Sequence, residues 1–273
     1  MRTTRKIVFG VFLLGLILAI SVVVVAKPNT DNLRDIVPAH AVQISEGVFS
    51  LGEATDPVSG KLVQGFMFID DRKANSHKPN HNPGEKGDKG GGDKTSSTCY
   101  SLFAKDAKWK TTENYTTSAE VDLALTEASL NAWDTEVSFD IFGTGTTGAT
   151  NVTGSDGGMD GSNEVELSDL GPSNTIAYTI VWGIFGGPPQ GRELVEWDAV
   201  FNTDYAWSDS GEAGKMDYQN IATHEFGHAL GLGHSPTDID CVEETMYPTA
   251  GYGETNKRTL ETGDLTGLGK LYS

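Results

Sequence analysis

The sequence predicts an α+β fold, because a helical pattern, a run of short strand-like segments and two further helical patterns follow one another in the chain. The chain has 273 residues, and the part that carries these patterns runs from 99 to 273. That length suits one domain with a sizeable core and is too short for two ordinary ones. We therefore expect one globular domain preceded by a leader, a short segment and a linker.

Residues 1–26 have the pattern of an export signal. Three basic residues precede twenty uncharged ones, Ile7 to Ala26, and Val24-Val25-Ala26 would serve as the cleavage point. The stretch is also long enough to span a bilayer, so a retained signal anchor is the alternative. In either case we expect a secreted protein, or one on the extracellular face whose only membrane contact is this segment when uncleaved.

Two further segments separate this leader from the domain. Residues 27–71 contain alternating strand-like stretches around a turn at 56–60, too few to fold alone, and form either a layer on the domain or a removable pro-segment. Residues 72–98 are dense in Gly, Lys, Asn and Pro, which predicts a disordered linker.

Charge is unevenly distributed along the chain. Residues 1–98 carry 12 basic and 10 acidic side chains, whereas residues 99–273 carry 8 and 28. A domain this acidic repels phosphate backbones, so we expect no nucleic-acid partner. We interpret the acidic residues as a solvated surface, with salt adaptation as the alternative.

Hydrophobic periodicity locates the elements of the domain. A first amphipathic helix is expected over 117–133, with Thr117 and Glu120 as a capping box and one apolar face made of Val121, Ala124, Leu125, Ala128 and Ala132. Strands are expected at Val137–Phe142, Glu164–Leu167, Thr175–Trp182 and Glu193–Asn202, and two later helices at about 217–230 and 263–272.

One string in the second helix determines the chemistry we expect. His224 and His228 are four residues apart on one helical face, within reach of one ion, and Glu225 lies where a base can accept a proton from a metal-bound water. Gly231 permits a left-handed turn that ends the helix and brings His234 back. Three imidazoles with an open fourth position are typical of a catalytic zinc site.

This string resembles that of the metzincin zinc peptidases, and within them the matrixins, with a likeness to minimal secreted microbial members. The resemblance implies zinc ligands at His224, His228 and His234, a general base at Glu225, and a Met-turn at Met246. It also implies a twisted mixed sheet, a long active-site helix and a short C-terminal helix. Glu193–Trp207 resembles the family's antiparallel edge strand and the segment after it.

The sequence also departs from the animal matrixins. It has no PRCGxPD cysteine-switch motif, and residues 99–273 contain no histidine beyond the three of the string. We therefore expect neither latency through a thiolate nor a second, structural zinc site.

The function predicted is an exported zinc endopeptidase, acting on protein or peptide substrates through a zinc-bound water activated by Glu225. The substrate would lie extended along an edge strand, at Glu193–Asn202 or the Gly-rich segment before it, and Pro248–Tyr252 would wall a pocket. We expect a monomer. The alternative is a cell-surface binding protein that retains a metal site without turnover.

Two secondary sites remain open at this point. Cys99 and Cys241 are the only cysteines of an exported chain, which favours a disulfide. The alternative is that Cys99 is an inhibitory zinc ligand. The Asp/Gly-rich stretch 155–164 offers Asp156, Asp160 and Glu164 as calcium ligands, although such stretches are more often plain turns.

Overall fold

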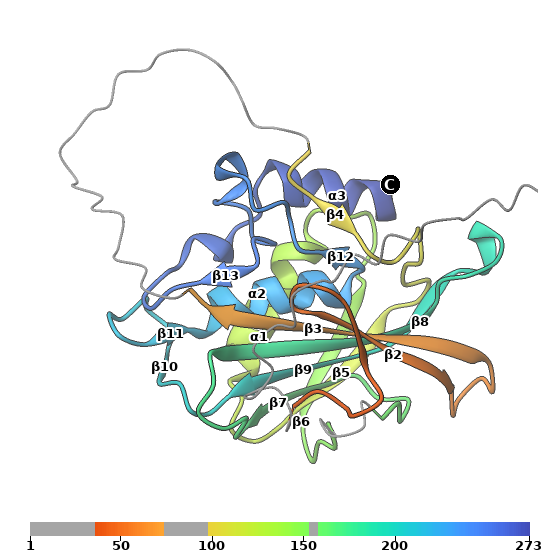
Figure 1. Cartoon of the computed structure of the whole chain (residues 1–273), viewed down its shortest axis with the longest axis horizontal. Helices are drawn as coiled ribbons and strands as arrows, with labels where there is room; N and C mark the ends of the chain where they lie inside the picture. The colour runs from red at the N-terminus through yellow and green to blue at the C-terminus, as the bar shows by residue number, and fades with distance from the viewer. Residues whose placement is uncertain (1–35, 74–97, 153–157) are drawn as a thin grey trace, which may run out of the picture. The chain divides into compact units, whose positions relative to one another are not determined.

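A computed structural model describes residues 36–73, 98–152 and 158–273, and in these ranges the chain is α+β, as predicted (Figure 1). One mixed sheet has the strand order β1-β2-β3-β8-β9-β7-β5-β6, with β13 pairing β3. The helices α1 (Leu123–Asp134), α2 (Tyr218–Ala229) and α3 (Thr262–Tyr272) lie together on one side of this sheet (Figure 1). Its strands are β1 (Val42–Ser45), β2 (Val48–Thr55), β3 (Leu62–Arg72), β5 (Glu113–Thr117), β6 (Phe142–Thr147), β7 (Glu164–Ser168), β8 (Thr175–Ile184), β9 (Glu193–Asn202) and β13 (Thr249–Ala250).

The centre of the sheet, at β8 and β9, lies against α2. β8 is a run of ten residues, nine of them buried, because its side chains contribute to two buried apolar clusters, one that includes the helices and one that includes Phe49 and Met67 of β2 and β3. β9 pairs with β8 on one side and β7 on the other. The expectation that Glu193–Asn202 is an edge strand is therefore wrong, since both of its edges are already hydrogen-bonded.

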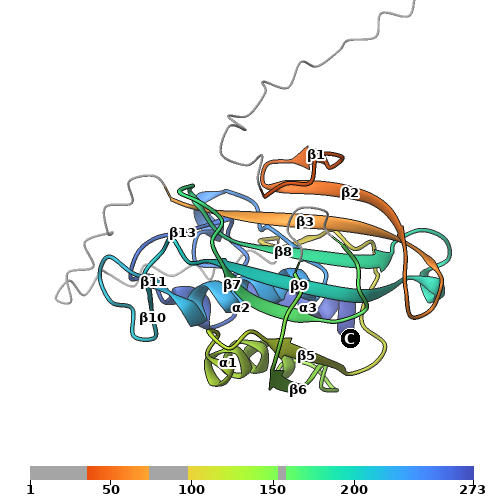
Figure 2. The same ribbon diagram turned by 90° about the horizontal axis from the view of Figure 1, so that it is seen from below.

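The N-terminal segment adds strands to this sheet (Figure 2). β2 and β3 form an antiparallel hairpin, and its turn is held by the Asp56 carboxylate, which accepts hydrogen bonds from the Val58 and Ser59 amides. β3 then pairs antiparallel with β8. The strand continues to Arg72, so the first residue assigned to the linker belongs to the sheet. The two strand-like stretches predicted here are confirmed, and they pack on the domain.

The first helix begins later than predicted and buries a different face. α1 spans Leu123–Asp134, and its cap is Asp122, whose carboxylate accepts from the Ala124 and Leu125 amides, not a box at Thr117. Its buried residues are Thr126, Ser129, Leu130 and Trp133, while Ala124 and Ala128 are exposed. The hydroxyls on the buried face are satisfied by backbone carbonyls one turn earlier, so polar residues fill positions that periodicity alone assigns to apolar ones.

The strand expected at Val137–Phe142 is also displaced. Residues 137–141 form a turn, and β6 begins only at Phe142. The Asp134 carboxylate at the end of α1 accepts hydrogen bonds from the amides of Ile141 and Phe142, which ties the turn to the helix. These hydrogen bonds to Asp134 hold the chain in a turn where the apolar residues alone predicted a strand.

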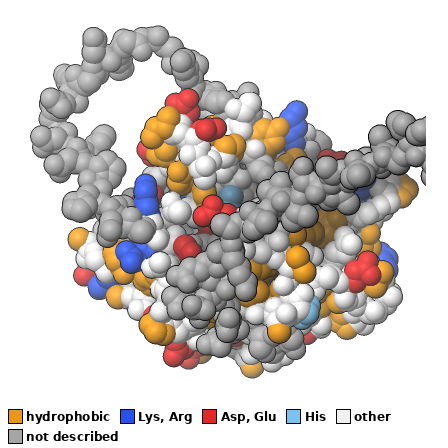
Figure 3. Space-filling view, viewed as in Figure 1, with side chains coloured by type: hydrophobic (Ala, Val, Ile, Leu, Met, Phe, Trp, Pro, Cys, Tyr) orange, Lys and Arg blue, Asp and Glu red, His pale blue; other side chains and the backbone are white. Residues whose placement is uncertain are grey.

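The two later helices agree with the sequence, whereas the strand β5 was not expected. α2 spans Tyr218–Ala229 and α3 spans Thr262–Tyr272. A disulfide joins Cys99 at the start of the domain to Cys241 before the Met-turn. Acidic side chains lie at several separate places on the visible face (Figure 3).

Several predictions fall on residues that the structure does not describe, among them the leader at 1–26 and the linker from 74 to 97. Within 36–73, 98–152 and 158–273, no helix has both the length and the apolar character needed to cross a bilayer.

Candidate active site

The three histidines of the motif come together at the end of α2. The helix begins at Asp217, whose side chain accepts a hydrogen bond from the Asn220 amide, and His224 and His228 follow on its buried face. Gly231 has a φ of 103°, the left-handed conformation expected where the helix ends. The chain then reverses, so that His234 Nε2 lies 3.2 Å from His228 Nε2.

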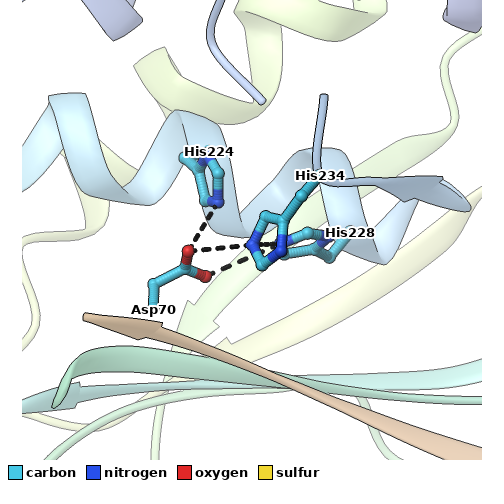
Figure 4. Close-up of side chains that lie close together, drawn as sticks. All are labelled: Asp70, His224, His228 and His234. Atoms are coloured by element: carbon cyan, nitrogen blue, oxygen red, sulfur yellow. Dashed lines mark hydrogen bonds and ion pairs between the residues drawn. The ribbon is translucent and has the colours of Figure 1, made fainter. Parts of the chain in front are cut away.

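A fourth side chain, Asp70, reaches this cluster from β3 (Figure 4). Its Oδ1 lies 3.0 Å from His224 Nε2 and 2.9 Å from His234 Nε2, and its Oδ2 lies 3.6 Å from His228 Nε2. All four candidate ligand atoms lie within 4.8 Å of one another. Asp70 is 4% exposed, so this carboxylate is buried among the imidazoles.

Backbone carbonyls determine the tautomer of two histidines. His224 Nδ1 lies 2.5 Å from the Thr245 carbonyl, and His228 Nδ1 lies 2.8 Å from the Leu232 carbonyl. A carbonyl can only accept, so each Nδ1 carries the proton and each Nε2 directs a lone pair at the cluster. Burial lowers the pKa of His224 to about 3 and also lowers the pKa of His228, which keeps both rings neutral.

This donor set fits a zinc ion. Neutral imidazole nitrogens and a carboxylate oxygen are zinc ligands, and second partners at Nδ1 orient metal-binding imidazoles in this way. Without a cation, the lone pairs of His224 and His228 would face the Asp70 carboxylate with no proton to share. His224 Nε2 is buried and has no hydrogen-bond partner among the described residues, as expected of an atom whose partner is an ion.

Glu225 lies beside this cluster in a fully buried position. Thr179 Oγ1, on β8, donates to Glu225 Oε2 at 2.5 Å, while Oε1 has no partner among the described residues. Burial raises the pKa of Glu225 well above its ordinary value, and the charge of Asp70 adds to this shift. Burial thus makes this carboxylate more basic than an exposed one, which favours acceptance of a proton.

The segment around Met246 packs against α2, the helix that carries His224 and His228. The side chain of Met246 is buried against Gly227 of α2, where even a Cβ would clash with its sulfur. Asp264, at the start of α3, accepts hydrogen bonds from the amides of Thr245 and Met246 at 2.7 and 3.1 Å. The Thr245 carbonyl accepts from His224 Nδ1, so Asp264 helps to orient the His224 ring by holding Thr245 in place.

A buried lysine completes this support. Lys257 is 1% exposed, and its ammonium group donates to the carbonyls of Thr245 and Tyr247 and lies 3.3 Å from His224 Nδ1. Burial lowers the pKa of Lys257 to about 8.

Two cavities are lined by residues of the segment after Met246. One, of about 390 Å³, has His234, Val48 and Pro248 in its lining. Another, of about 200 Å³, is lined by Tyr247, Tyr252 and neighbours in the segment after Met246. The segment Pro248–Tyr252 thus borders cavities, where a substrate pocket was expected.

The candidate calcium residues are only partly described. Asp156 lies outside the described residues, Asp160 is exposed, and Glu164 is buried. The amides of Asp160 and Gly161 donate hydrogen bonds to the carboxylate of Glu196, so this carboxylate already has donors within the protein.

Sequence reasoning missed Asp70 and Thr179 as parts of this site. The available signal was weak: two consecutive acids, Asp70 and Asp71, interrupt an apolar strand. Nothing in the local sequence indicates that this strand lies beside a helix that follows more than a hundred residues later.

Comparison with known proteins supports the family resemblance. Residues 171–273 match the family described as Matrixin. Matrilysin of Homo sapiens is 39% identical over 103 residues, covering 37% of this chain and 33% of matrilysin. Matrix metalloproteinase-20 of Homo sapiens is 31% identical over 182 residues, which cover 63% of this chain and 34% of that protein. Metalloendoproteinase 1 of Glycine max is 38% identical over 78 residues, which cover 26% of this chain and 24% of that protein. The chain thus spans about a third, or less, of the length of these relatives.

Proposed function

The chain carries a matrixin-like region, and from this premise we propose that it is an exported zinc endopeptidase acting on protein or peptide substrates. The observation that carries the proposal is the position of Glu225. It is fully buried next to three converging histidines, with one carboxylate oxygen free of partners among the described residues. A protein that only binds a metal has no need of such a base.

His224, His228 and His234 would hold the zinc ion in this proposal. The chemistry that zinc supplies in such sites is polarisation of a carbonyl and acidification of a water molecule. Glu225 accepts the proton of the attacking water and returns it to the leaving amine. Thr179 orients this carboxylate, and the carbonyls of Thr245 and Leu232 orient the imidazoles.

Two finer parts of the proposal rest on sequence. Export follows from the pattern of residues 1–26, and a calcium ion would bind at Asp156, Asp160 and Glu164.

The experiment pairs zinc content with casein cleavage, for the wild-type chain and Glu225→Ala, each before and after removal of the N-terminal segment. Zinc bound by both chains at one equivalent, with cleavage only by wild type, is the expected result. Zinc in both without cleavage by any form would refute the endopeptidase and favour a cell-surface metal-binding protein.

A further inference from the structure

Strand β3 lies where an extended peptide would pair with β8. The sheet order places β3 against the edge of β8 that faces away from β9, with Gln64–Asp71 paired antiparallel to Thr175–Gly183. On its other side, Asp71 and Arg72 pair in parallel with β13, directly after the Met-turn. A peptide added to an open sheet edge is recognised through such main-chain hydrogen bonds. The chain therefore fills its own strand-binding edge.

The side chains of β3 alternate between two apolar environments. Met67 and Ile69 pack in the cluster that includes Phe49 and Ile180, on the far side of the sheet. Phe68 and Asp70 face α2, where the Phe68 ring stacks on His228 with centroids 4.2 Å apart. The alternation of a strand thus delivers Asp70 to the histidines two residues after Phe68.

Asp70 also changes the number of ligands available at the site. Catalytic zinc sites keep one position open for water or substrate, whereas sites with four protein ligands are closed. His224, His228, His234 and Asp70 together supply four candidate ligands. Asp70 is buried like His224 and His228, which leaves little access for a competing ligand.

We propose that β3 is an internal inhibitor that lies in the substrate cleft, and that the Asp70 carboxylate blocks the site by supplying a fourth metal ligand. This inference rests on the proposed function and adds its regulation. The chain remains latent while β3 is paired with β8, and peptide cleavage requires Asp70 to leave the histidines. The acid takes the inhibitory role without a thiol, since Cys99 and Cys241 are joined in a disulfide.

The test uses the full chain loaded with Co²⁺ as a spectroscopic substitute for zinc. Asp70→Ala is compared with wild type and with Asp71→Ala, which removes the neighbouring carboxylate that accepts from Thr175 Oγ1 and is not one of the four candidate metal ligands. We expect the visible absorption of bound Co²⁺ to change in Asp70→Ala and to stay as in wild type in Asp71→Ala. Acetohydroxamate, a small bidentate ligand, should bind Asp70→Ala at least 10-fold more tightly than the other two chains. Asp70→Asn, which is isosteric, should behave like Asp70→Ala and guards against a folding defect.

Cleavage of casein by the same zinc-loaded chains separates this inference from the proposed function. At least 10-fold faster cleavage by Asp70→Ala than by wild type or Asp71→Ala supports both. Changes in spectrum and hydroxamate affinity, with no cleavage by any chain either before or after removal of the N-terminal segment, support the Asp70 ligand and refute the endopeptidase. Identical spectra and hydroxamate affinities in all chains overturn the inference, whatever their activity.

Discussion

Replacing Asp264 with alanine should destabilise the segment that supports the histidines. The Asp264 carboxylate is fully buried and accepts three backbone hydrogen bonds, from the amides of Thr245, Met246 and Glu261 at 2.7, 3.1 and 2.9 Å. Alanine leaves all three donors without this acceptor. An unsatisfied buried donor costs about 1–3 kcal/mol, so the gross loss is roughly 3–9 kcal/mol.

The net loss should lie near the lower end of that range. Burial raises the pKa of Asp264, which means that desolvation of the ionised carboxylate already offsets part of its hydrogen bonding. We expect the free energy of unfolding to fall by about 3 kcal/mol. Zinc affinity should fall about 10- to 100-fold, because the Thr245 carbonyl that orients His224 loses its support.

The measurement is urea unfolding followed by tryptophan fluorescence at pH 7 in EDTA, in a Glu225→Ala background that prevents self-cleavage. Asp122→Ala is the matched control, because Asp122 also accepts two backbone amides, at the start of α1, but is exposed. Loss of that cap should cost about 1 kcal/mol and leave zinc affinity unchanged. Equal losses of stability in the two variants, or an unchanged zinc affinity in Asp264→Ala, would refute the reasoning.

Three further predictions concern the base, the disulfide and a buried acid. Thr179→Val removes the donor to Glu225 and should lower kcat about 10-fold with little change in KM, whereas Thr179→Ser should retain activity; steady-state kinetics after removal of the N-terminal segment measure both. The double substitution Cys99→Ser and Cys241→Ser opens a loop of 142 residues and should lower the free energy of unfolding by about 2–5 kcal/mol in urea titrations. The reduced wild-type chain is the matched control, and the double variant should be as stable as this reduced chain. Burial raises the pKa of Glu196 to about 8, so the folded chain binds more protons than the unfolded one between the ordinary pKa and that value. Stability should therefore fall as pH rises through this window, by up to about 1.4 kcal/mol per pH unit for one carboxyl. Thermal melts in metal-free buffer should show this fall, and a slope as steep in Glu196→Gln as in wild type would contradict the assignment.

Local sequence determined the parts of this protein that depend on helical spacing and turn chemistry. The separation of His224 and His228 sets their common face, and Gly231 adopts the left-handed conformation that ends the helix. The turn between β2 and β3 likewise depends on Asp56 and its immediate neighbours. These features involve residues within a few positions of one another, where the covalent chain itself restricts the geometry.

Tertiary structure alone decided which strands are edges and what reaches the histidines. Glu193–Asn202 has a strand on each side, and the buried face of α1 is the one whose hydroxyls find backbone acceptors. Asp70 meets His234 across 164 residues of chain, because β3 pairs with β8 and β8 lies beneath α2. Pairing between strands depends on hydrogen bonds and burial that only the assembled sheet provides, so a local pattern carries almost no information about it.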